Sequence, residues 1–228
     1  GPPLTMLVDI YPGIHRTGVA SPEAAVALFR AIAAEPTLRY GGVQYYCGAQ
    51  QHIESFAERE AVMHERAAYL REVIAALAAA GGAPPIVSGG GTGTHRIDAT
   101  LGCFTELQVG SYVFMDDQYQ ACALTAEAGE MPFETALMVD TRVISTNADA
   151  LVTVDAGFKA LATDARPPTI VDGAADGTVF FFMGDEQGAL FNPASDKPAL
   201  NAIITLAAPH CDPTVNLHDH YVCVRGGL

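Results

Sequence analysis

Apolar positions in the first half of the chain alternate between short continuous runs and helical spacing. The run at 6–10 predicts a strand, and 40–46 predicts a second one. Ser21 followed by Pro22 predicts the start of a helix that continues to about residue 34, because serine caps helices and proline fits their first turn. Between 55 and 80 apolar residues recur every three or four positions, which predicts a long helix.

Two further strands are predicted at 85–88 and 106–109, each followed by a glycine-bearing turn. Strands that alternate with helices at this spacing pair in parallel through right-handed crossovers. The pattern indicates an α/β fold. A TIM-like (β/α)₈ barrel and a doubly wound sheet both fit it.

The pattern changes near residue 120, where helical spacing gives way to short β-branched and aromatic runs separated by turn residues. The predicted strands of this half are 135–145, 150–154, 178–183, 200–206 and 219–224. We therefore predict an α/β domain over 1–120 and an antiparallel β domain over 121–228.

Composition narrows the classes of function. Half of the 228 residues are hydrophobic and 17% are charged, which permits a sizeable core. The formal net charge is −14, and no segment is rich in lysine or arginine, which argues against nucleic acid or an anionic membrane as a partner. No apolar run approaches the roughly 20 residues of a membrane span. Five widely spaced cysteines without a C-x-x-C pair favour free thiols in a cytoplasmic protein.

A glycine-rich segment directly follows the strand at 85–88. Peptide N–H groups in such a turn can surround phosphate oxygens, and Ser88, Thr92 and Thr94 add hydroxyl groups. A second small-residue turn, 110–112, follows the next strand, and neighbouring strand ends of a barrel often share one phosphate. The segment predicts a phosphate site, and a plain flexible turn is the alternative.

His210 and Asp212 form the second candidate site. In an extended chain residues two apart point to the same face, so imidazole and carboxylate would converge while Cys211 points away. That ligand pair suits Mn²⁺, Mg²⁺ or Zn²⁺. A polar turn flanked by prolines is the alternative, and His218 and His220 fit a structural or solvent-facing role better.

Three more side chains occupy strand ends, where α/β barrels place their active sites. Tyr46 and His52 follow the strand at 40–46, and Arg16 follows the first strand. Packed or exposed side chains without a catalytic role are the alternative for each of the three.

Six segments occur in an order and spacing that resemble one family. They are 7–19, 46–52, 88–93, 106–112, 154–157 and 210–217. The chain resembles D-threonine aldolase, 3-hydroxy-D-aspartate aldolase and D-serine dehydratase, which are alanine-racemase-like enzymes (fold-type III) that use pyridoxal phosphate. That resemblance implies the C-terminal half of a barrel followed by a β domain.

The resemblance also implies a chemistry. It implies pyridoxal 5'-phosphate as cofactor, a divalent metal (Mn, Mg or Zn) held by His210 and Asp212, and His52 as the base that takes the proton of the substrate hydroxyl. The substrate would be a β-hydroxy D-amino acid cleaved to glycine and an aldehyde, in an enzyme that pairs as a homodimer. The residues assigned to the cofactor are Arg16, Tyr46, Ser88, Gly90, Gly91, Thr92, Gly110, Ser111 and Tyr112.

Two departures from the family stand out. Its Schiff-base lysine lies on the first barrel strand, before the segment that matches Met6, whereas this chain has only Lys159 and Lys197. Four predicted parallel strands also cannot close an eight-stranded barrel. We therefore expect the N-terminal part of the same enzyme to be a partner of this chain.

Other functions stay open. Family dehydratases tend to place a cysteine two residues after the histidine, and Cys211 lies one position away, so a D-serine dehydratase is the close alternative. The missing lysine favours a non-catalytic fragment or one half of a split protein. A barrel enzyme that binds sugar phosphates without pyridoxal is the third possibility.

Overall fold

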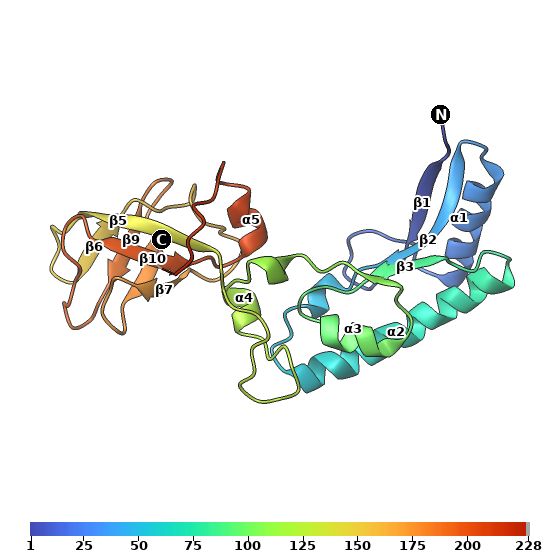
Figure 1. The fold of residues 1–228 in the computed structure, drawn as a ribbon, viewed down its shortest axis with the longest axis horizontal. Helices are drawn as coiled ribbons and strands as arrows, with labels where there is room; N and C mark the ends of the chain where they lie inside the picture. The colour runs from blue at the N-terminus through green and yellow to red at the C-terminus, as the bar shows by residue number, and fades with distance from the viewer. Residues whose placement is uncertain (227–228) are drawn as a thin grey trace. The chain divides into compact units, whose positions relative to one another are not determined.

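The computed structural model describes residues 1–226, so the last two residues of the predicted β domain lie outside it. The chain forms two compact units (Figure 1). The first contains 1–112 and 122–132, and the second contains 113–121 and the described residues from 133 onward. The boundary predicted at residue 120 falls near the end of 113–121, the first of the two short segments that the units exchange.

The first unit is a parallel α/β unit. Its sheet has the strand order β1-β2-β3-β4, with every neighbouring pair parallel. Val8 lies opposite Val43, which lies opposite Val87, so one buried row crosses three strands. The elements in chain order are β1 (Leu4–Asp9), α1 (Pro22–Ala34), β2 (Leu38–Tyr45), η1 (Gly48–Gln50), α2 (Phe56–Ala79), β3 (Ile86–Gly89), α3 (His95–Leu101), β4 (Glu106–Leu107) and η2 (Ser111–Val113).

Local sequence explains where the two long helices begin. The Ser21 hydroxyl accepts a hydrogen bond from the backbone N–H of Ala24, and the Ser55 hydroxyl accepts one from Glu58. The buried face of α2 recurs at helical spacing and joins the row of strand valines in one core. These helices therefore form as the sequence predicts, and they cover the sheet whose strand ends carry the candidate site.

The second unit is an antiparallel six-stranded sheet of order β7-β10-β5-β6-β9-β8. Leu161, Leu190, Ile204 and Leu206 belong to its core. The predicted fold class, α/β followed by antiparallel β, is confirmed. The elements are α4 (Asp117–Gln120), β5 (Met138–Ser145), β6 (Leu151–Val154), β7 (Thr169–Asp172), β8 (Val179–Phe182), β9 (Gly188–Phe191), β10 (Ile203–Ala207) and α5 (Cys211–Val215).

The structure differs from the sequence predictions in three places. Residues 219–224 form no strand, because no neighbouring strand pairs with them, and Val222 is 91% exposed. Strands β7 and β9 were not predicted. The segment after His210 is the short helix α5 and not an extended chain, and the Thr214 hydroxyl closes its first turn on the His210 carbonyl. Within the described residues, no helix is both long and apolar enough to cross a membrane.

Candidate active site

The glycine loop after β3 is built for close backbone approach. Gly90 has a φ of +68°, in the left-handed region that favours glycine. A Cβ on Gly91 would lie 2.6 Å from the Gln51 side-chain oxygen, and one on Gly93 would lie 1.9 Å from the Gln51 backbone oxygen. The whole segment is buried against its neighbours. Only glycine fits at these positions, so the loop is a packed structure and not a flexible turn.

The structure brings the two predicted phosphate turns together. The backbone N–H of Gln108 donates to the Gly89 carbonyl over 2.8 Å, and that of Tyr112 donates to the Thr92 hydroxyl over 3.0 Å. Gly110 and Ser111 lie on the stretch between these two contacts, and a Cβ on Gly110 would meet nothing within 4 Å. The ends of β3 and β4 therefore form one small-residue surface.

This surface fits a phosphate group. Among the described residues, none accepts a hydrogen bond from the backbone N–H of Gly90 or of Thr92, so both donors remain for phosphate oxygens. Ser88 is already occupied, since its hydroxyl donates to Glu106 Oε1 over 2.6 Å and accepts from Gln108 Nε2 over 3.0 Å.

Two ionisable groups are buried near the loop. Burial raises the pKa of Asp98 to about 6, although the Thr94 hydroxyl and the Gly91 N–H lower it in part. Burial also raises the pKa of the Cys47 thiol to about 12, and the nearby Asp98 carboxylate adds to that rise. Cys47 is therefore an unreactive core thiol at neutral pH.

The side chains predicted to surround the cofactor ring come from the ends of β1 and β2. The guanidinium carbon of Arg16 lies 5.5 Å from the centre of the Tyr46 ring, which is cation–π distance. His52 follows η1 and is exposed. The structure thus brings Arg16 and Tyr46 into contact and leaves the His52 ring at the surface of the unit.

His210 and Asp212 converge although the backbone is not extended. His210 caps α5, and its Nε2 lies 3.4 Å from Asp212 Oδ2, a separation typical of two ligands on one ion, about 3 to 3.5 Å. Its Nδ1 lies 2.8 Å from Asp164 Oδ2. The pair is an N/O donor set that fits a divalent cation. Within residues 1–226, no group of three or more His, Cys, Asp or Glu side chains forms a candidate metal site.

Sequence reasoning missed several supporting residues. Asp164 lies 46 positions from His210, and no sequence signal connects them. Asp116 is fully buried and accepts the Cys211 backbone N–H over 2.7 Å, which fixes the start of α5. Thr94 and Asp98 stand four apart at the start of α3, a spacing that could have placed both on one helix face.

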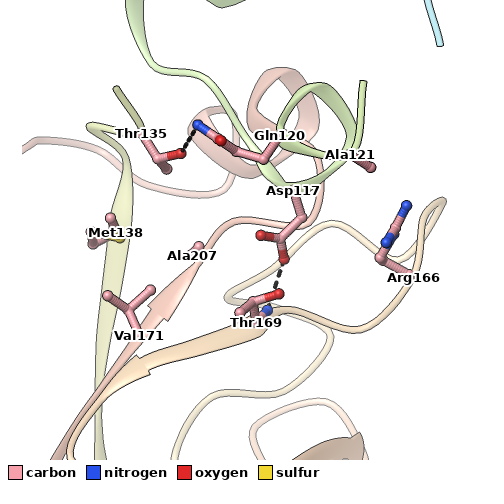
Figure 2. A pocket seen from close by; sticks show the side chains of 9 residues that line it. All are labelled: Asp117, Gln120, Ala121, Thr135, Met138, Arg166, Thr169, Val171 and Ala207. Atoms are coloured by element: carbon pink, nitrogen blue, oxygen red, sulfur yellow. Dashed lines mark hydrogen bonds between the residues drawn. The ribbon is translucent and has the colours of Figure 1, made fainter. Parts of the chain in front are cut away.

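A cavity of about 500 Å³ in the β unit is lined by none of the predicted site residues. In Figure 2, Asp117 accepts the backbone N–H of Thr169 over 2.7 Å, and Gln120 donates to the Thr135 hydroxyl over 2.8 Å. These polar groups already bond to one another. Burial raises the pKa of Asp117.

Similarity to known proteins adds to this geometry. Residues 1–118 match the family described as alanine racemase, N-terminal domain, and residues 136–224 match the putative serine dehydratase domain. The chain is 39% identical over 234 residues to 3-hydroxy-D-aspartate aldolase of Paracoccus denitrificans (strain Pd 1222). It is 35% identical over 229 residues to D-threonine aldolase of an Arthrobacter species. The chain belongs to the D-threonine and 3-hydroxy-D-aspartate aldolase family.

A solved structure agrees with this membership. The crystal structure of D-threonine aldolase from Filomicrobium marinum matches with a TM-score of 0.90 and 36% identity, over 98% of this chain and 60% of that one. The resemblance expected from the six segments is confirmed, as is the fold class of a partial alanine-racemase-like barrel followed by a β domain. All of this aldolase-family chain aligns with the two curated relatives, and it spans 58% and 59% of their lengths.

Proposed function

We propose that the complete protein is a lyase that uses pyridoxal 5'-phosphate and a divalent metal to cleave β-hydroxy D-amino acids to glycine and an aldehyde. The observation that carries this proposal is that one chain holds both a glycine-lined phosphate surface and a converging His–Asp pair. The names of the relatives supply the substrate class, D-threonine or 3-hydroxy-D-aspartate.

The α/β unit would hold the cofactor. Phosphate oxygens would accept the N–H groups of Gly90 and Thr92, with Gly91, Gly110, Ser111 and Tyr112 around them. Arg16 and Tyr46, already in contact, would flank the ring. When bound, the cofactor supplies an electron sink for the bond that breaks at the substrate α-carbon. Ser88 would act indirectly, through its contacts with Glu106 and Gln108.

The β unit would hold the metal on His210 Nε2 and Asp212 Oδ2. A divalent cation there supplies positive charge that favours the ionised form of a hydroxyl group. Asp164 at Nδ1 fixes the ring orientation and keeps a proton on that nitrogen, which leaves Nε2 free to act as a ligand. His52 would take the proton of the substrate hydroxyl as general base.

The lysine that binds the cofactor would come from sequence outside this chain. Lys159 lies 2.5 Å from Glu186 in an exposed ion pair, and Lys197 donates to the carbonyl of Thr146 over 3.1 Å. Both belong to the antiparallel β unit, and neither follows a parallel strand in the chain. The proposed partner is therefore the N-terminal part of the same cytoplasmic enzyme, which would assemble as a homodimer.

A direct assay tests this function. The complete protein, supplied with pyridoxal 5'-phosphate and Mn²⁺, Mg²⁺ or Zn²⁺, should release glycine and acetaldehyde from D-threonine. Chelation of the metal should abolish that release. Pyruvate from D-serine without aldehyde from D-threonine would overturn the aldolase proposal.

One observation favours a D-serine dehydratase as the second candidate. The Cys211 Sγ lies 3.6 Å from Asp212 Oδ2, so a thiol is close to the proposed metal ligands, and the β unit matches the putative serine dehydratase domain. Cys211 is 1% exposed and packs in an apolar cluster with Leu137 and Ala208. That packing favours Asp212 as the ligand and thus the aldolase.

A further inference from the structure

Gln51 is a fully buried polar residue that connects two strand ends. It follows η1 at the end of β2 and is 0% exposed. Its side-chain oxygen accepts the backbone N–H of Gly93 over 3.0 Å, and its amide nitrogen donates to the Cys47 carbonyl over 3.2 Å. The same nitrogen donates to the Thr94 hydroxyl over 3.0 Å. One side chain thus joins the loop after β2 to the glycine loop after β3.

Thr94 continues this connection beneath the loop. Its hydroxyl has one proton, which it donates to Asp98 Oδ2, so its lone pairs accept the N–H of Gly91 and the amide of Gln51. Thr94 is 0% exposed and Asp98 is 1% exposed. With Asp98 ionised, the donor and both acceptor positions of the Thr94 hydroxyl are thus in use, which fixes the loop more strictly than packing alone.

The network divides the backbone N–H groups of the loop into two alternating sets. Those of Gly91 and Gly93 are bound by Thr94 and Gln51. Those of Gly90 and Thr92 have no acceptor among the described residues. Alternate peptide groups are thus held from within, and the intervening ones remain for an anion.

The packing is equally tight. A Cβ on Gly91 or Gly93 would overlap Gln51, and one on Gly90 would lie 2.4 Å from Asp98 Oδ2. The loop packs directly against Gln51 and Asp98. A substitution of either residue should therefore change the loop conformation available to bind an anion.

We propose that Gln51, acting through Thr94 and Asp98, is the positioning residue that holds the glycine loop in its phosphate-binding shape. This inference rests on the proposed function, in which that loop binds the cofactor phosphate. Gln51 touches no phosphate in this arrangement; it orients the peptide groups that do.

The test compares pyridoxal 5'-phosphate with pyridoxal, which lacks the phosphate, in the complete protein. Affinities are measured by equilibrium dialysis for wild type, Gln51→Leu and Thr94→Val. Thr94→Ser keeps the hydroxyl and is the conservative variant. Gln120→Leu is the matched control, because Gln120 is an exposed glutamine of the β unit bonded to Thr135. Thermal unfolding without ligand reports the purely structural effect.

Gln51→Leu and Thr94→Val should each weaken binding of the phosphorylated form by about tenfold or more, or about 1.4 kcal/mol. Pyridoxal binding should change less than about twofold, while Thr94→Ser and Gln120→Leu should bind both as wild type does. If Gln51→Leu does not fold, the comparison of Thr94→Val with Thr94→Ser tests the proposal.

The positioning role of Gln51 would be overturned if the variants bound pyridoxal 5'-phosphate and pyridoxal with equally reduced affinity. It would also be overturned if the variants had a lower melting temperature but an unchanged affinity for pyridoxal 5'-phosphate. A wild-type protein that binds both compounds equally well would instead reject the phosphate surface of the proposed function, and this inference with it.

Discussion

Replacing Asp98 with asparagine should remove part of the pH dependence of the free energy of unfolding. Asp98 lies beneath the glycine loop, 1% exposed, and burial raises its pKa from the ordinary 3.8 to about 6. Its protonated form is therefore favoured in the folded state. The stabilising contribution is fully present below about pH 3.8 and is lost as the pH rises through about 6.

The size of the effect follows from that shift. A difference of about two pKa units, at 1.36 kcal/mol each, corresponds to about 3 kcal/mol. Asparagine does not titrate. The free energy of unfolding of wild type minus that of Asp98→Asn should therefore fall by about 3 kcal/mol between about pH 2.8 and about pH 7, which lie about one unit outside the two pKa values. The altered hydrogen bond to Thr94 also changes the free energy of unfolding, but by the same amount at every pH.

Urea unfolding of the complete protein and its variant across this range measures the difference. All other carboxyl groups are common to both proteins and cancel. A difference that stays constant with pH, or that grows as the pH rises, would refute the view that burial raises the pKa of Asp98.

Three further outcomes are expected. Asp164→Asn should weaken metal affinity about 10- to 100-fold in calorimetry by releasing the His210 ring, and unchanged affinity would contradict that role. Gly93→Ala should destabilise the protein by about 3 kcal/mol in denaturant unfolding, because its Cβ would lie 1.9 Å from the Gln51 backbone oxygen. Gly110→Ala should cost less, because a Cβ there meets nothing within 4 Å, and equal losses for the two variants would refute the packing argument. Ser55→Ala should cost about 1 kcal/mol in the same assay through loss of the α2 cap, and no loss would show that the cap is dispensable.

The sequence by itself determined the local structure of this aldolase-family chain. Ser21 caps its helix as predicted, and Ser55 caps the helix that the spacing of apolar residues predicted, because a cap depends only on residues three positions away. The parallel strands followed from the alternation of strands and helices, and the glycine loop followed from its composition. These features depend on interactions between near neighbours in the chain.

The tertiary structure decided the rest. Residues 219–224 have a strand-like pattern, yet no strand forms, since a strand needs a partner edge that the pattern cannot show. Gln51 and Asp164 are recognisable only because folding brings them to residues 42 and 46 positions away. Hydrogen bonds and burial across such separations depend on the packing of whole elements, which one-dimensional periodicity does not contain.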